Sequence, residues 1–271
     1  MNAPGLRRTV LTRLAKCALV LLAYPFIANA MTDASKAFSD PKVVELANAA
    51  QSGDLAAVAS LLKAGADPHV VGKHGMTVAH FALLAPRSVA PSIMKALLDA
   101  GADPVSVLVD GNTVPMIAVS RNDADPAMVR VLMDHGIGPN WRPPQDPYKD
   151  TALLHQAISG HNRPVVELLI KQGANIDYVD PFTGSALHAA LGGTQFAVAA
   201  VLVDAGIDLS LQNNTSSEIK NPRVVRRTAF EYFCKFDGGK RGANPLPDVA
   251  AGWAQLEAAL ARRGTSMPCG L

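Results

Sequence analysis

Stripes of apolar residues at helical spacing recur along this chain of 271 residues. In residues 54–63 the apolar side chains that share one helical face are Leu55, Val58, Leu61 and Leu62. Residues 164–171 repeat the stripe, and Pro164 suits the first turn of a helix because its missing N–H would have no partner there. The pattern predicts short amphipathic helices, each of which must bury one face against a neighbour.

Five of these helical stretches end in similar glycine-containing strings. The strings are Leu61–Asp67, Leu97–Asp103, Leu132–Gly138, Leu168–Asn175 and Leu202–Asp208. Their glycines follow one another at intervals of 36, 35, 37 and 33 residues. A glycine just beyond a helix end usually adopts a positive φ, which strains residues that carry a Cβ. The sequence therefore predicts a helix end at each of these glycines.

A second string lies about ten residues after each of the first four glycines and recurs once more after a longer gap. Its copies are Gly75–Ala82, Gly111–Ala118, Leu153–Ala157, Ser185–Ala190 and the degenerate Thr228–Phe233. These strings resemble the ankyrin repeat, whose signature Thr-Pro-Leu-His-x-Ala recurs about every 33 residues. The resemblance implies an all-α solenoid of about six helix–loop–helix units with hairpin-like loops and atypical capping units.

The domain organisation follows from the reach of the repeats. We expect a signal peptide over residues 1–30, a polar lead-in over 31–42, the repeat domain over 43–264 and a C-terminal tail over 265–271. The first unit, residues 43–65, lacks the histidine string. The last unit, residues 228–263, carries an inserted loop over 236–248 before a second helix expected at 249–263.

The first thirty residues have the composition of a secretory leader. Arg7, Arg8, Arg13 and Lys16 precede an apolar run over residues 17–27, and Ala28–Ala30 forms an Ala-x-Ala site. We expect cleavage after Ala30 and a periplasmic location. A retained membrane anchor is the alternative, although the run is shorter than the ~20 residues that a spanning helix needs.

Composition and charge narrow the classes of function. Hydrophobic residues make up 49% and charged residues 18%, which excludes disorder along most of the chain, and the 5% of aromatic residues favours closely stacked helices. Without the leader the chain carries 21 basic and 23 acidic residues, and it has no block of lysine and arginine. A nucleic-acid partner is therefore not expected.

Candidate chemistry is sparse. His80, His155 and His188 occupy the histidine of the ankyrin string, whose usual role is to hold its own loop by hydrogen bonds, and they lie too far apart to share a metal. No nucleophile elbow or phosphate-binding glycine loop occurs, so we expect no enzyme, metal or cofactor. Cys234 and Cys269 could pair in an oxidising compartment or remain as two thiols.

The candidate binding site lies at the loop tips. Trp141 and Tyr178 each stand five residues past a repeat glycine, so they occupy equivalent positions on adjacent units. Trp, Tyr and Arg are typical of interface hot spots. The predicted partner-binding residues are Trp141, Arg142, Tyr148, Lys149, Tyr178, Asp180 and Phe182. The alternative is that the proline-rich loop over 141–150 folds its aromatic side chains onto the stack.

These features predict a monomeric module that binds one specific protein. A leader followed by an ankyrin stack without an enzyme motif is similar in architecture to the periplasmic immunity proteins that neutralise lipase effectors of type VI secretion. An accessory role for a periplasmic enzyme such as a catalase, and a host-directed effector, remain as alternatives. The likeness is one of fold, which does not by itself determine function.

Overall fold

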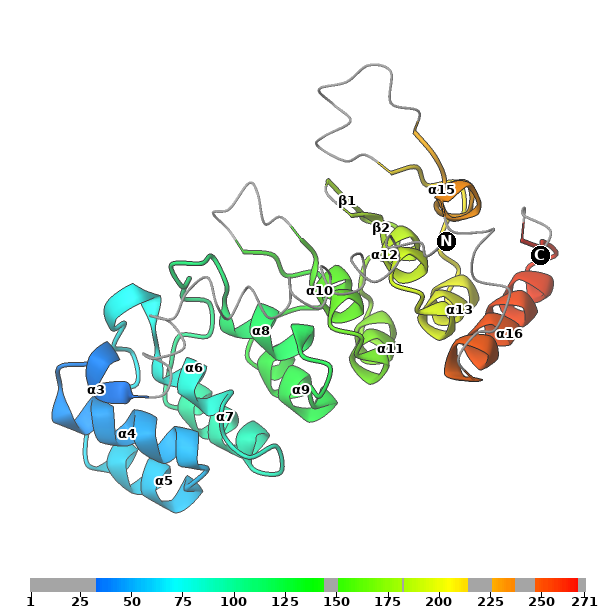
Figure 1. The fold of residues 1–271 in the computed structure, drawn as a ribbon. Coiled ribbons are helices and arrows are strands. Elements are labelled where there is room, and N and C mark those ends of the chain that lie inside the picture. Colours follow the sequence, from blue (N-terminus) through cyan, green and yellow to red (C-terminus); the bar gives the residue numbers. More distant parts are fainter. Residues whose placement is uncertain (1–32, 144–150, 182, 214–225, 237–246, 268–271) are drawn as a thin grey trace, which may run out of the picture. The chain divides into compact units, whose positions relative to one another are not determined.

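The structure is a computed structural model that describes residues 33–143, 151–181, 183–213, 226–236 and 247–267. The chain divides into two units, Met1–Asp110 and Gly111–Leu271. Within each unit short helices pack in antiparallel pairs (Figure 1). The described residues form six such pairs, which confirms the predicted all-α fold of about six helix–loop–helix units.

The first unit contains two helix pairs and a short helix ahead of them. Its elements are α3 (Ala34–Ala37), α4 (Pro41–Ser52), α5 (Leu55–Lys63), the 3-10 turn η1 (Lys73–Gly75), α6 (Val78–Ala82) and α7 (Ala90–Asp99). Helix α4 packs against α6, and α5 packs against α7. The inner and outer helices of successive pairs therefore form two layers.

The second unit continues the same arrangement over four pairs. Its elements are α8 (Val114–Ser120), α9 (Pro126–Asp134), α10 (Leu153–Ser159), α11 (Arg163–Lys171), β1 (Val179–Asp180), β2 (Gly184–Ser185), α12 (Ala186–Gly192), α13 (Phe196–Asp204), α15 (Ala229–Phe236) and α16 (Pro247–Arg262). The layer α8–α10–α12–α15 packs on the layer α9–α11–α13–α16 (Figure 1). Helix α16 lies close to the predicted 249–263.

The recurring glycine string ends each outer helix in one way. Gly65, Gly101, Gly136, Gly173 and Gly206 all adopt positive φ, between 83° and 95°. The amide of the residue after each glycine donates to a leucine carbonyl five residues earlier, as Ile137 does to Leu132 at 3.1 Å. This Schellman pattern satisfies a carbonyl that the helix leaves without a partner. It explains why leucine and glycine recur together at this spacing.

The predicted polar lead-in differs from what the structure shows. Residues 34–37 form helix α3, which begins at Asp33 and buries Ala34 and Ala37. Phe38 is buried as well, with its ring 5.7 Å from that of Phe81. The segment is rich in polar residues, so its sequence did not show that Ala34, Ala37 and Phe38 form an apolar face. This face covers the first helix pair.

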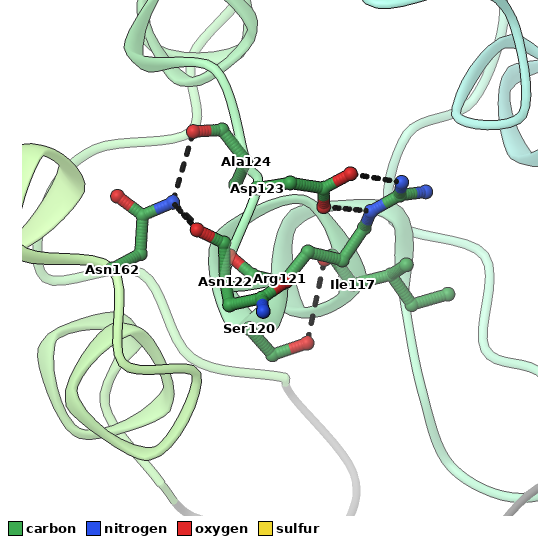
Figure 2. A network of polar contacts seen from close by, with 7 residues as sticks. All are labelled: Ile117, Ser120, Arg121, Asn122, Asp123, Ala124 and Asn162. Atoms are coloured by element: carbon green, nitrogen blue, oxygen red, sulfur yellow. Dashed lines mark hydrogen bonds and ion pairs between the residues drawn. The ribbon is translucent and has the colours of Figure 1, made fainter.

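A buried asparagine joins two successive pairs of the second unit (Figure 2). The Asn162 side chain accepts a hydrogen bond from the Val165 amide at 3.0 Å and thereby caps α11. Its Nδ2 donates to the carbonyl oxygens of Arg121 (3.1 Å), Asn122 (3.3 Å) and Ala124 (2.9 Å). The side chain therefore fixes the loop between α8 and α9, which Arg121 and Asp123 also brace by an ion pair of 2.9 Å.

The C-terminal pair is held by aromatic rings. Trp253 on α16 lies 4.9 Å from Phe196 of α13 and 5.9 Å from Phe233 of α15, measured between ring centroids. Gly252 lets α16 approach α13 closely, because a Cβ there would come within 2.9 Å of the Ala197 amide nitrogen. Within the described ranges, no helix is both long and apolar enough to cross a membrane.

Candidate partner-binding edge

The loops of the second unit place Trp141 and Tyr178 in equivalent turns. The Trp141 amide donates to the Gly138 carbonyl at 2.9 Å, and the Tyr178 amide donates to the Asn175 carbonyl at 3.4 Å. Each bond spans three residues and begins two residues past a repeat glycine. The two aromatic residues therefore hold the same position in adjacent units, as their spacing in the sequence predicts.

A hydrogen-bond ladder links successive turns. Asn140 accepts a bond from the Asn175 amide at 2.6 Å and donates to the Gly173 carbonyl at 3.0 Å. One repeat further on, Asp177 accepts from the Asp208 amide at 2.8 Å. Because each link joins a side chain to the backbone of the next turn, the three turns at 138–141, 175–178 and 208–211 are held in a defined order.

The Tyr178 ring is fixed on two sides. The guanidinium carbon of Arg142 lies 4.3 Å from the centre of the Tyr178 ring, within the range of a cation–π contact. The buried His155 ring meets Tyr178 edge-on, with centroids 5.6 Å apart. Trp141 and Tyr178 are half-buried and Arg142 is exposed. The structure thus brings together three of the predicted binding residues, and two of them are in direct contact.

Asp180 does not belong to the exposed part of this edge. Its side chain is fully buried, and a carboxylate oxygen accepts from the Thr183 amide at 2.8 Å across the turn between β1 and β2. Asp180 therefore shapes the hairpin and cannot be reached by a partner. Tyr148, Lys149 and Phe182 lie outside the described residues, as do the expected leader and Cys269, the proposed partner of Cys234 on α15.

The histidines of the ankyrin string differ in what they hold in the described part of the chain: His188 bonds both to its own loop and to the next one, whereas His155 bonds only to the next loop and His80 only to its own. At the start of α12, the Nδ1 of His188 accepts from the Ser185 amide at 3.2 Å, and its Nε2 donates to the Arg227 carbonyl at 3.0 Å. The Nε2 of His155 likewise donates to the Gly184 carbonyl at 3.0 Å. Among the described residues, no three His, Cys, Asp or Glu side chains form a group that could hold a metal ion.

The N-terminal cap of an inner helix pairs a hydroxyl residue with a histidine three residues later. Two neighbouring units each lack one of these two residues. In α8 a methionine, Met116, replaces the histidine, and the buried Thr113 hydroxyl finds no hydrogen-bond partner among the described residues. In α10 an alanine, Ala152, replaces the threonine, and the Nδ1 of His155 finds none in the described part of the chain either. The last unit keeps the cap in another form, because Thr228 and Glu231 form a reciprocal capping box at the start of α15.

Restoring the missing hydroxyl should stabilise the protein. Ala152 has φ −63° and ψ 148°, close to the −69° and 163° of Ser185, so serine fits there without backbone change. We expect Ala152→Ser to raise the free energy of unfolding by ~0.5–1.5 kcal/mol, because its hydroxyl can donate to the Nδ1 of His155. Urea unfolding measures this change. The mirror change Ser185→Ala should cost a similar amount, and a destabilising Ala152→Ser would contradict the interpretation.

Stability should fall in mild acid. Burial lowers the pKa of His80 from 6.5 to about 4, against the opposing charges of Asp103 and Asp110. Burial also lowers the pKa of His155, against Asp180 and the hydrogen bond to Gly184. Between pH 6.5 and 4 the unfolded chain therefore binds more protons than the folded chain, so acid favours unfolding.

For His80 the loss should reach about 2 kcal/mol at pH 5 relative to pH 7.5. Urea unfolding at the two pH values measures it. The difference between the two pH values should shrink in His80→Gln, because glutamine does not titrate. An unchanged difference in that variant would show that other groups cause the acid sensitivity.

The hollow between α13 and α16 offers no catalytic set. Its lining includes Ala197, Ala200 and Val201, together with two arginines. Arg262 is paired with Asp204 at 2.7 Å, and Arg163 is paired with Glu167 at 2.7 Å. Both charges are thus already engaged at the protein surface.

One exposed cluster was missed in the sequence. Val71, Val107 and Val109 lie exposed on the loops of the first unit. The signal was available in the run Val105–Val109, where valines alternate along a loop that follows a repeat glycine. Interface hot spots are typically Trp, Tyr and Arg, so this criterion does not select valines.

Comparison with known proteins agrees with the repeat pattern. A family model described as "Ankyrin repeats (3 copies)" matches residues 46–140 and 84–180. The B-cell lymphoma 3 protein homolog of Mus musculus is 31% identical over 157 residues, covering 56% of this chain and 33% of that protein. The human B-cell lymphoma 3 protein is 32% identical over 157 residues, covering 45% of this chain and 34% of that protein. The match spans about a third of the length of these relatives.

Solved structures show the same arrangement of helices. The crystal structure of the ankyrin repeat domain of Bcl-3, described as a unique member of the IkappaB protein family, superposes with a TM-score of 0.57 at 22% identity, covering 82% of this chain and 86% of that one. The human ASB11 ankyrin repeat domain gives a TM-score of 0.55 at 23% identity, covering 84% and 90%. At such identities the likeness concerns the fold alone.

Proposed function

The chain is an ankyrin-repeat protein, and we propose that it holds one protein partner through the loop edge formed by Trp141, Arg142 and Tyr178. The observation that carries this proposal is the contact of Arg142 with the Tyr178 ring, which also meets the His155 ring edge-on. Aromatic and arginine side chains that are already ordered lose little entropy when they bind. The ladder through Asn140 and Asp177 keeps the two turns in place.

The sequence supports the same edge, because it carries additional residues between the repeat strings at 144–150 and 214–225. The described residues on either side of the second insertion are bonded to each other, because the Asn213 amide donates to the Arg227 carbonyl at 2.9 Å. In repeat proteins, insertions of this kind commonly lie on the binding face.

The partner class follows from the expected leader. A periplasmic ankyrin protein without a catalytic motif suits an immunity protein that neutralises a lipase effector of type VI secretion. Affinity capture from periplasmic extract tests this assignment. A lipase-type partner supports it, a catalase-type partner supports the accessory role, and a chain found outside the cell supports the host-directed role. A full-length chain resident in the membrane would contradict cleavage after Ala30.

Trp141→Ala should weaken binding of the captured partner by ~2 kcal/mol or more, with little effect on folding. Titration calorimetry and urea unfolding measure the two effects separately. Tyr178→Ala should affect both, because the ring also packs on the buried His155. The tip position of Tyr178 in the sequence suggests a surface side chain whose replacement would affect binding alone.

The matched control is Leu168→Ala on α11, where the side chain is 5% exposed. It should cost ~2–5 kcal/mol of stability while the remaining folded protein binds normally. If Trp141→Ala destabilises the fold as much as Leu168→Ala and leaves binding unchanged, the aromatic loop belongs to the core. The interface must then be sought on the inner helices.

A further inference from the structure

Three exposed valines gather on two neighbouring loops of the first unit. The exposed fractions are 54% for Val71, 41% for Val107 and 59% for Val109. The loops lie side by side, since the Val109 amide donates to the His74 carbonyl at 3.2 Å and the Ser106 hydroxyl donates to the Gly75 carbonyl at 3.0 Å. We call these three residues the valine surface. The other exposed large apolar side chains of the described residues, Leu55 and Tyr232, lie on helices.

The described part of the chain begins beside this surface. Helix α3, which begins directly after Asp33, packs against η1. Gly72, next to Val71, faces the Ala37 carbonyl and the Phe38 ring so closely that a Cβ would come within 2.5 Å of that carbonyl oxygen. Helix α3, with which the described part of the chain begins, therefore lies close to the loop that carries Val71.

We infer that, in the chain with its leader still attached, the apolar segment 17–27 docks on the valine surface. Only residues 28–32 separate this segment from Asp33, a span of at most ~18 Å. A tether this short gives the segment a millimolar effective concentration, so a small apolar surface is enough to hold it.

The charges on either side are complementary. The leader carries Arg7, Arg8, Arg13 and Lys16 before the apolar run and has no acidic residue. The two loops that bear the valines carry Asp67, Asp103 and Asp110 against one lysine, Lys73, and are therefore acidic on balance. Cleavage after Ala30 removes both the apolar and the basic part of the segment. The valine surface is then uncovered only in the processed chain.

Photo-cross-linking of the full chain, synthesised in a cell-free system without membranes, tests the inference. A benzophenone amino acid at position 107 should cross-link to residues 17–27, as identified by mass spectrometry. The control probe replaces Leu55 on α5, which is also 41% exposed. We expect at least a fivefold higher yield from position 107. Similar yields from the two positions, or no product with residues 17–27, would overturn the inference.

A second experiment distinguishes the leader segment from a second copy of the chain as the occupant of the valine surface. With the probe at position 71, the pair Val107→Ser and Val109→Ser should reduce the cross-link severalfold, whereas Leu55→Ser should leave it unchanged. Circular dichroism verifies that each variant is folded. In a mixture of isotopically light and heavy chains, cross-links joining light to heavy would overturn the inference and assign the valine surface to contact between copies. A yield unaffected by the serine pair would also overturn it.

Discussion

Replacing Asn162 with alanine should lower the free energy of unfolding by about 2–4 kcal/mol. The side chain is only 3% exposed and joins two helix pairs through four hydrogen bonds. Its removal leaves the Val165 amide and the carbonyl of Ala124 without their partner in a place that water reaches poorly. Urea unfolding followed by circular dichroism measures the loss.

Asn140→Ala is the matched control for this change. Asn140 also bridges two successive units by both of its amide atoms, but it is exposed. Water can replace its bonds, so we expect a loss below about 1 kcal/mol. Asn162→Asp should cost at least as much as Asn162→Ala, because it keeps the cap acceptor but places a carboxylate against carbonyl oxygens. Equal losses for Asn162→Ala and Asn140→Ala would contradict the importance of burial.

Replacing Trp253 with alanine should cost about 3 kcal/mol. The indole is half-buried, and it contacts Phe196 and Phe233, whose rings also lie 5.7 Å apart. The change therefore opens a gap among three aromatic rings that join α13, α15 and α16. Hydrogen exchange should rise first in α15 and α16, because a terminal helix pair has a neighbour on one side only.

Glu257→Ala is the control on the same helix. Its side chain is exposed, so we expect a change within about 0.5 kcal/mol. If Trp253→Ala raised hydrogen exchange equally throughout α8–α16, the C-terminal pair would not be a separately opening cap. If it changed the stability no more than Glu257→Ala, the ring cluster would not hold α16.

The regular parts of the fold could be read from the sequence, because a single physical requirement recurs in them. Each outer helix must end with a satisfied leucine carbonyl and a residue at positive φ, so Leu132 and Gly136 predict a helix end without knowledge of the rest. The equivalent turns of Trp141 and Tyr178 follow from the same periodicity. Their contacts with Arg142 and His155 do not, since these depend on side-chain directions.

The features that the sequence did not predict depend on contacts between residues far apart in the chain. Asn162 appears in the sequence only as a polar residue before a helix, and its three carbonyl partners lie about 40 positions earlier. Asp180 resembles an exposed loop acid, yet the hairpin buries it. The sequence does not predict the valine surface, because an exposed valine belongs to no recognisable motif. Only the packing of neighbouring loops shows that three valines lie together.

The incomplete N-terminal caps of α8 and α10 affect which part of the second unit opens first. In a linear repeat protein, cooperativity passes only through the interfaces between nearest neighbours. Among the described residues, Thr113 and the Nδ1 of His155 are buried and unsatisfied, so the first turns of α8 and α10 each lack one hydrogen bond. The two helix pairs stay joined, because the buried Asn162 side chain still bonds to the loop between α8 and α9. The first turns of α8 and α10 should therefore open more often than those of α12 and α15, whose capping boxes are complete, and hydrogen exchange should be faster there.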